Sequence, residues 1–206
     1  MKKEKFSVRL AQPSDAAALL EIYTPFVISE DSSLSDVSFE YEAPSQEEFC
    51  GRIRSISAGY PYLVLEADGI PAGYAYAHPY IQRAAYQWDA EVTIYLSPAA
   101  QGRGLGCRLY GVLEKLLALQ GIVNLYSCIT GSNEHSIMMH RAMGYEIIGR
   151  FERSGFKHGH WLDMVWMGKR LGACPEHPEL IKRFCDVDSG KIEEILRQAE
   201  TELNSN

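Results

Sequence analysis

The chain has 206 residues, which is enough for one large domain or for one domain with an appendage. Its 46% hydrophobic and 23% charged residues are ordinary for a globular protein, and a net charge of −7 without a Lys/Arg cluster argues against a nucleic-acid partner. The uncharged runs are too short to cross a membrane, and no apolar stretch follows the N-terminal "MKKEKFSVRL", so neither a membrane span nor a signal peptide is predicted.

Hydrophobic periodicity predicts alternating strands and helices. Residues 5–10 are typical of a strand, 13–27 of a helix and 35–44 of a short extended segment, and Ser45 with Glu48 indicates a capping box that opens a helix over 45–53. Apolar runs around Asp68-Gly69 predict a β-hairpin over 60–79, followed by a strand at 88–96. A helix with leucines at three- and four-residue spacing follows residue 104.

The rest of the chain continues this pattern. We expect a strand at 123–129, a helix at 133–142 started by Ser132 or Asn133, and two strands at 145–152 and 161–168 around a loop. The residue pattern changes at "GACPEHPEL", and the C-terminal tail that follows is predicted to end in an acidic amphipathic helix. These elements favour one α+β domain with mixed strand directions and a C-terminal appendage.

The stretch "QGRGLG", residues 101–106, lies between a predicted strand and a predicted helix. Its glycines have neither the Rossmann spacing nor the Gly-Lys-Ser/Thr of a Walker A loop. Glycines before a helix allow the first amides to turn towards an anion, and Arg103 could add its charge. The loop is therefore either a diphosphate cradle or a turn that only reverses the chain.

Several stretches together resemble a known family. The pattern Gln101-x-x-Gly104-x-Gly106 after "VTIYLSP" resembles the acetyl-CoA pyrophosphate signature of the GNAT N-acetyltransferases. More specifically, "HPYIQRAAYQWDAEVTIYLSP", "GSNEHSIMMHRAMGYEIIGRFERSGFKHGHWLD" and "VSFEYEAPSQEEF" resemble the phosphinothricin acetyltransferase family in order and spacing. The resemblance implies a GNAT fold, with the GNAT domain at residues 1–171 and a C-terminal extension at 172–206.

The resemblance also implies where acetyl-CoA binds. The strand around residue 95 would splay from its neighbour and pair with the pantetheine arm, while the glycine loop would donate amides to the pyrophosphate. The implied contacts are Ile94, Tyr95, Leu96, Gly102, Arg103, Gly104, Leu105, Gly106, Cys107 and Asn133.

Three residues are the implied catalytic groups. Glu91 matches the glutamate taken to deprotonate the acceptor amine, which cannot attack a thioester while it is an ammonium. His140 lies two helical turns after Asn133 and suits a base or relay. Tyr145 would protonate the departing thiolate. The alternatives are a strand-end glutamate facing water, a packed helix histidine and an aromatic that only packs against the preceding helix.

The acceptor pocket is implied at the loop "FKHGHW" and its surroundings. Lys157, His158 and Arg83 could hold a carboxylate and phosphinate or sulfone oxygens, and Phe39 and Tyr41 could form the walls. The alternative for Arg83 and Lys157 is solvated loop charge.

These residues predict an enzyme that acetylates the amino group of a small amino acid or analogue by direct attack in a ternary complex. A peptide or protein N-acetyltransferase and a non-catalytic acyl-CoA-binding module are the alternatives. The five cysteines lack CxxC or Cys/His ligand spacing, so we expect reduced thiols, no metal and a cytoplasmic location. The family further implies a homodimer.

Overall fold

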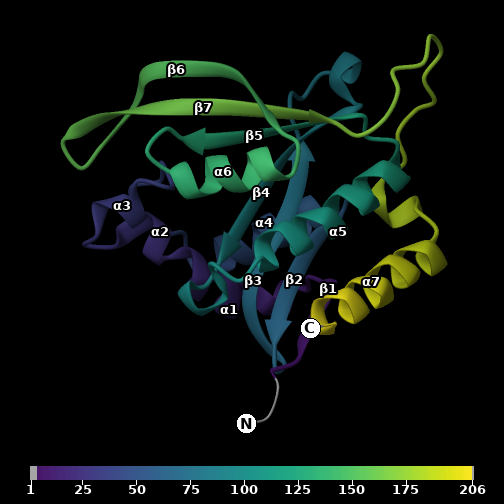
Figure 1. The fold of residues 1–206 in the computed structure, drawn as a ribbon, viewed down its shortest axis with the longest axis horizontal. Helices are drawn as coiled ribbons and strands as arrows, with labels where there is room; N and C mark the ends of the chain where they lie inside the picture. Colours follow the sequence, from purple (N-terminus) through teal and green to yellow (C-terminus); the bar gives the residue numbers. More distant parts are fainter. Residues whose placement is uncertain (1–3, 206) are drawn as a thin grey trace.

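The computed structural model describes residues 4–205 and is built on one mixed sheet, shown in Figure 1. The strand order is β1-β2-β3-β4-β5-β7-β6, and every neighbouring pair is antiparallel except β4 and β5. The strands are β1 (Phe6–Leu10), β2 (Tyr62–Ala67), β3 (Ile70–Pro79), β4 (Asp89–Leu96), β5 (Asn124–Thr130), β6 (Glu146–Lys157) and β7 (His160–Arg170). The expected α+β class with mixed strand directions is confirmed.

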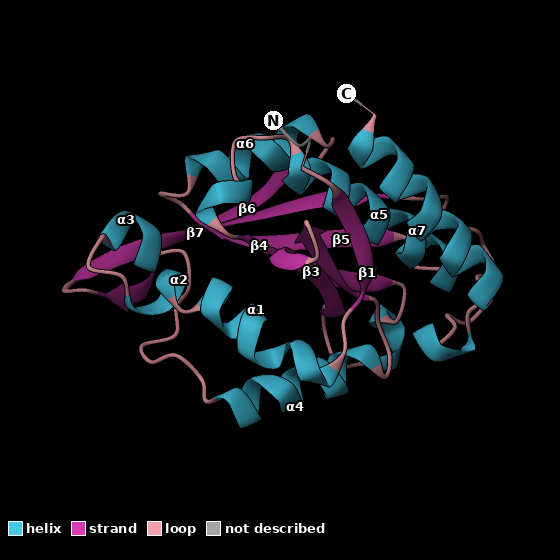
Figure 2. Cartoon of the chain, turned by 90° about the horizontal axis from the view of Figure 1, so that it is seen from below, coloured by secondary structure: helices cyan, strands magenta, loops and turns pink. Residues whose placement is uncertain are grey.

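Helices cover both faces of the sheet, as Figure 2 shows. They are α1 (Ala16–Tyr23), α2 (Pro25–Ile28), α3 (Ser32–Ser35), α4 (Gln46–Ser57), α5 (Leu105–Gln120), α6 (Glu134–Ala142) and α7 (Ser189–Asn204). Helices α1 and α4 pack on one face, against Tyr62, Val64 and Tyr74. Helices α5 and α7 share the other core with Leu63 and Ala75. Alternation along β2 and β3 sends neighbouring residues to these two cores.

The sheet is interrupted at its centre. The parallel strands β4 and β5 pair only from Asp89 to Glu91 on one side and from Asn124 to Tyr126 on the other. Beyond Glu91, β4 stays paired with β3 but no longer with β5. Strand edges with unpaired N–H and C=O groups are ready partners for an extended ligand.

Several local predictions are confirmed. The β2–β3 hairpin turns at Asp68 and Gly69, which both have positive φ as a two-residue turn requires. The Ser45 hydroxyl caps α4 by accepting from the Glu48 amide, although the Glu48 carboxylate bonds Arg52 instead of closing a capping box. The Asn133 side chain caps α6.

Two local predictions are wrong. The expected extended segment at 35–44 is not extended at its start: Ser35 ends α3 and a turn follows at 36–37, where the Asp36 carbonyl accepts from the Thr130 hydroxyl at the end of β5. The expected loop at 153–160 is instead strand: β6 and β7 continue to a two-residue turn at His158 and Gly159, both with positive φ. The added length of β6 and β7 brings the hairpin into contact with segment 35–41. The sequence pattern of either segment taken alone does not predict this contact.

The predicted C-terminal helix is α7, and it packs on α5 and β1. Its last residue, Asn204, covers the free edge of β1. The Asn204 amide accepts from the Phe6 N–H at 2.9 Å and donates to the Phe6 carbonyl at 2.7 Å, as a neighbouring strand would.

Candidate active site

A small cavity of about 70 Å³ lies where β4 and β5 separate. Residues 92–95 of β4 and 127–130 of β5 form its two sides, and Val37, Tyr110, Asn133, Ser136 and His140 complete its lining. The cavity therefore joins the expected cofactor strand to α5 and α6. Of the predicted cofactor contacts, Ile94, Tyr95 and Asn133 line it directly.

The glycine loop leads into α5, and its last residue, Gly106, lies close to Ile94 of the cavity lining: a Cβ at Gly106 would be 3.7 Å from the Ile94 Cδ1 atom. Gly102 and Gly104 have φ values of +70° and +72°, and a Cβ at either would meet no atom within 4 Å. Glycine is therefore needed there for backbone conformation. Within residues 4–205, no hydrogen bond outside helices and strands uses the amides of residues 102–107. This arrangement of unbonded amides at a helix N-terminus fits a diphosphate.

The third glycine has a different role. A Cβ at Gly106 would lie 3.0 Å from the Met139 sulfur and 3.3 Å from a Leu96 methyl carbon, so Gly106 allows α5 to approach α6 and β4 closely. The two residues beside Gly106 differ in exposure: Leu105 is buried and Cys107 is half-buried.

The Arg103 guanidinium points away from the expected diphosphate. It forms an ion pair with Glu4 at 2.5 Å and lies 4.9 Å from the centre of the Phe6 ring. Its contact with a phosphate stays a prediction, and such a contact requires this exposed pair to open.

Glu91 is the last residue of β4 that pairs with β5, and it lies directly opposite His78 on β3. Cross-strand partners share one face of a sheet, which here is the α1/α4 side. Burial raises the pKa of Glu91, and the His78 imidazole opposes that shift. A half-buried carboxylate with a raised pKa at a break in the sheet is a reasonable general base.

His140 is buried on the opposite face, beside α5. Its Nδ1 lies 2.8 Å from the Ser136 carbonyl oxygen, and its Nε2 lies 3.2 Å from the Tyr110 hydroxyl. Burial lowers the pKa of His140, so the imidazole is neutral near pH 7. The sequence did not reveal Tyr110, since it lies among the apolar positions of α5 and resembles a core residue.

Tyr145 is also buried and its ring contacts that of His140, with centroids 5.0 Å apart. Its hydroxyl, however, is not part of the cavity lining and is oriented towards Glu114 of α5, which pairs with Lys169. The structure thus brings the Tyr145 ring to the site but not its hydroxyl. Its role as the proton donor stays a prediction.

Lys157 is 3% exposed and ends β6 under segment 27–38. Its ammonium donates to the carbonyls of Val27, Ser35 and Ser38 at 3.0, 2.6 and 2.7 Å. An ammonium has three protons, so these bonds use all of its donors. Lys157 therefore ties this segment to the hairpin, and it could hold a substrate carboxylate only by giving up one of these bonds.

The other expected acceptor residues belong to the same contact between segment 35–41 and the β6–β7 hairpin. The His158 Nε2 lies 3.0 Å from the Ser35 hydroxyl, the Phe39 ring fills the space above Gly155, and the Tyr41 hydroxyl donates to a carbonyl of β6. These contacts close one side of the site.

Arg83 lies apart from these residues, exposed in the loop between β3 and β4. It is near the Glu91 end of that strand pair, and its contact with an acceptor stays a prediction.

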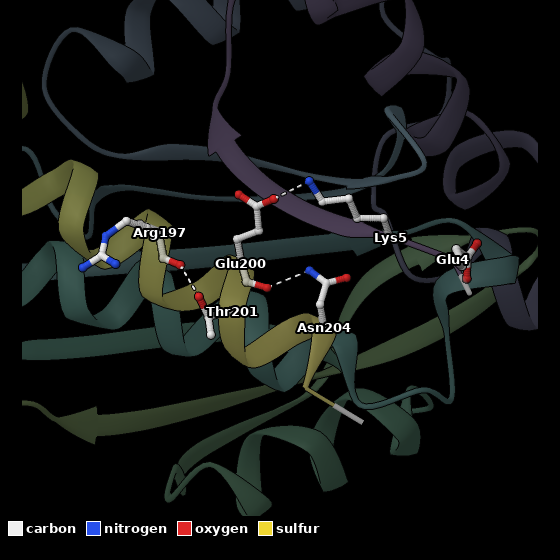
Figure 3. Close-up of a pocket in the computed structure, with 6 residues that line it drawn as sticks. All are labelled: Glu4, Lys5, Arg197, Glu200, Thr201 and Asn204. Atoms are coloured by element: carbon white, nitrogen blue, oxygen red, sulfur yellow. Dashed lines mark hydrogen bonds and ion pairs between the residues drawn. The ribbon is translucent and has the colours of Figure 1, made fainter. Parts of the chain in front are cut away.

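A wider hollow of about 430 Å³ lies elsewhere, between α7 and the beginning of the chain, as Figure 3 shows. Its charged side chains are paired: Lys5 with Glu200 at 2.9 Å across the hollow, Glu4 with Arg103, and Arg197 with Glu194. None of the catalytic candidates lines this hollow, so the candidate active site is the β4–β5 separation. Within residues 4–205 there is no cluster of three His, Cys, Asp or Glu suited to a metal ion and no helix long and apolar enough to cross a membrane.

A helix N-terminus whose amides have no partner among residues 4–205, a separated strand pair and a half-buried carboxylate at that separation are the features expected of an acyl-CoA-dependent transferase. The chain belongs to the GNAT acetyltransferases: the acetyltransferase (GNAT) domain family matches residues 8–166. The resemblance to the phosphinothricin acetyltransferases is confirmed as well. The chain is 35% identical over 157 residues to phosphinothricin N-acetyltransferase of Streptomyces viridochromogenes, which covers 76% of this chain and 83% of that protein.

Two further relatives extend the comparison. An L-methionine sulfoximine/L-methionine sulfone acetyltransferase of Salmonella typhimurium is 28% identical over 169 residues, 80% of this chain and 94% of that protein. The crystal structure of a phosphinothricin acetyltransferase from Sinorhizobium meliloti in complex with AcCoA superposes with a TM-score of 0.77 at 33% identity, over 87% of this chain and 98% of that chain.

Proposed function

We propose that this protein transfers the acetyl group of acetyl-CoA to the amino group of a small amino acid or analogue, of the phosphinothricin or methionine sulfoximine/sulfone type. The transfer is direct, in a ternary complex. The observation that carries the proposal is the half-buried Glu91 at the point where β4 leaves β5, next to a cavity lined by these two strands, α5 and α6. The names of the relatives support the acceptor class.

Acetyl-CoA supplies an activated acetyl thioester when it binds. The amides of residues 102–107 would hold its diphosphate, and the unpaired edge of β4 would hydrogen-bond its pantetheine amides. The residues present fit such a donor, because within residues 4–205 these amides have no hydrogen-bond partner and β4 beyond Glu91 is not paired with β5. No metal is needed for this step.

The acceptor amine would approach from the opposite face of the sheet. Glu91 shares that face with Tyr95, which packs on Tyr23 of α1, whereas His140 packs on α5. Amine and thioester can then meet in the gap between the strands. Glu91 takes a proton from the ammonium, and the freed amine attacks the acetyl carbon.

The acceptor side is covered by segment 35–41 and the β6–β7 hairpin, which the Lys157 ammonium ties together. A covered site suits a small molecule better than a peptide, which requires an open groove. The acceptor is therefore proposed to be small.

Thiol release from acetyl-CoA tests the proposal. Phosphinothricin, methionine sulfoximine, methionine sulfone, common amino acids and a peptide would be compared as acceptors. We expect saturable release with at least one small acceptor and none with the peptide. Release with the peptide alone would favour the peptide N-acetyltransferase. Acetyl-CoA binding without release would favour the non-catalytic module.

We also propose a homodimer, formed through the outer face of β6. This edge strand exposes Ile147, Ile148, Phe151 and Phe156, and β7 exposes Trp161 opposite Phe156. An exposed apolar edge of this length is a typical association surface. A cytoplasmic location and a role in resistance to amino acid analogues belong to the same proposal.

Sedimentation velocity tests the dimer. We expect twice the chain mass of 23.1 kDa for the wild type and the monomer mass for Phe151→Glu, because a charge there opposes burial. Ile70→Glu, at a similarly exposed residue that begins β3 next to the β2–β3 turn, is the control and should leave the dimer intact. A monomeric wild type would contradict the proposal.

A further inference from the structure

Tyr110 lines the cavity, although no motif in the sequence indicates a functional role for it. It lies on α5, is 1% exposed, and lines the cavity together with Ile94 and Tyr95 of the cofactor strand. Its hydroxyl lies 3.2 Å from His140 Nε2 and 3.4 Å from the Ser127 hydroxyl. A polar network this deep in a core has to satisfy its donors and acceptors.

The hydrogen bonds fix which atom carries which proton. A carbonyl oxygen only accepts, so the His140 Nδ1 that lies 2.8 Å from the Ser136 carbonyl must be protonated. In a neutral imidazole Nε2 then only accepts, and the Tyr110 hydroxyl donates to it. The Ser127 hydroxyl can in turn donate to the Tyr110 oxygen. A proton from the cavity can thus reach His140 Nε2 by way of the Tyr110 hydroxyl.

We propose that Tyr110 and His140 form a proton relay in which the Tyr110 hydroxyl, and not the Tyr145 hydroxyl, exchanges protons with the reacting atoms. The inference rests on the proposed function. Glu91 removes the first proton of the acceptor ammonium on the other face of the sheet. The relay handles the second proton, which must travel from the nitrogen of the acceptor to the sulfur of the donor.

The step balances without any further reactant. After the new C–N bond forms, the nitrogen gives its proton to the Tyr110 oxygen while the Tyr110 proton moves to His140 Nε2, which becomes an imidazolium. When the C–S bond breaks, the same two transfers run in reverse and the thiolate receives the proton. Tyr110 and His140 end in their starting states. Burial raises the pKa of Tyr110, so a free phenolate is unfavourable and the two transfers are concerted.

The chain offers a matched pair of variants. The rings of Tyr110 and Tyr145 both contact the His140 ring edge-on, with centroids 5.2 and 5.0 Å apart, and both are buried. Only the Tyr110 hydroxyl reaches Nε2 and lines the cavity. Tyr110→Phe and Tyr145→Phe therefore remove the same atom from similar surroundings, and only one of the two atoms belongs to the relay.

The experiment measures kcat and KM for acetyl-CoA in both variants, together with the nitrogen resonances of the His140 imidazole in the full-length protein without ligand. We expect Tyr110→Phe to lower kcat about 100-fold with KM nearly unchanged, and to shift the Nε2 resonance because its hydrogen-bond donor is lost. For Tyr145→Phe we expect kcat within about threefold of wild type and an unshifted Nε2 resonance.

Other results overturn the relay. If Tyr110→Phe keeps more than a third of kcat, the hydroxyl is structural, even where the Nε2 resonance shifts. If the Nε2 resonance does not shift in Tyr110→Phe, the hydrogen bond from the Tyr110 hydroxyl to His140 Nε2 does not exist in solution, and the relay is overturned. A large loss of kcat in Tyr145→Phe alone assigns the proton donor to Tyr145. If the wild type is inactive towards every acceptor, the proposed function is overturned, and the relay with it. A change in the Nε2 resonance alone bears only on the hydrogen bond and leaves the proposed function standing.

Discussion

Replacing Glu91 by glutamine is expected to lower kcat/KM about a hundredfold at neutral pH, without loss of folding stability. Glutamine keeps the size and shape of the side chain and one acceptor oxygen, but it cannot take a proton from the acceptor ammonium, and general bases contribute roughly 10²–10⁴-fold. Stability should hold because Glu91 is only half-buried and makes no ion pair among the described residues.

The pH dependence of kcat/KM is a second test of Glu91 as the general base. Burial raises the pKa of Glu91, and the base works only when it is ionised. The kcat/KM of the wild type should therefore fall as the pH decreases through a pKa above the ordinary value for glutamate, and this acid limb should be absent in Glu91→Gln. His78→Gln is the matched comparison: it removes the group that opposes the shift, so the acid limb should move to higher pH.

The outcome that contradicts the assignment is a Glu91→Gln variant with more than a third of wild-type kcat/KM and an unchanged acid limb. The base would then be another group, and the raised pKa of Glu91 would only reflect its burial.

Replacing Lys157 by methionine is expected to lower the free energy of unfolding by about 3 kcal/mol. Methionine keeps an unbranched apolar stem as far as the ε position but leaves the carbonyls of Val27, Ser35 and Ser38 buried without a donor, and each such group costs roughly 1–3 kcal/mol. Urea denaturation measures this change. Lys115→Met, at a half-exposed lysine of α5, is the control and should change stability by less than about 0.5 kcal/mol.

The same variant separates two roles for Lys157. If Lys157 mainly holds segment 27–38 against the β6–β7 hairpin, the variant should lower the free energy of unfolding more than it changes the KM of the acceptor. As a clamp for the acceptor carboxylate, it would raise the KM of the acceptor while leaving unfolding nearly unchanged. This second result would restore the role that the family resemblance implies and contradict the structural one.

The sequence alone determined the features that depend on near neighbours in the chain. The turn at Asp68-Gly69, the caps at Ser45 and Asn133 and the glycine loop each follow from a few adjacent residues whose backbone or side-chain chemistry permits little else. The family motifs likewise indicated Glu91 and His140 from short local patterns. These predictions needed no knowledge of the packing.

Only the tertiary structure decided what depends on distant partners. Residues 35–44 alternate like a strand but have no strand to pair with, while residues 153–160 resemble a loop yet pair across a tight turn. Lys157 looks like a solvated charge until carbonyls 119 or more positions away surround it. Tyr110 looks like an apolar core residue until α6 brings His140, 30 positions later, to its hydroxyl. Local patterns specify backbone geometry, but the partner of a side chain depends on which elements pack together, and that is settled by burial over the whole fold.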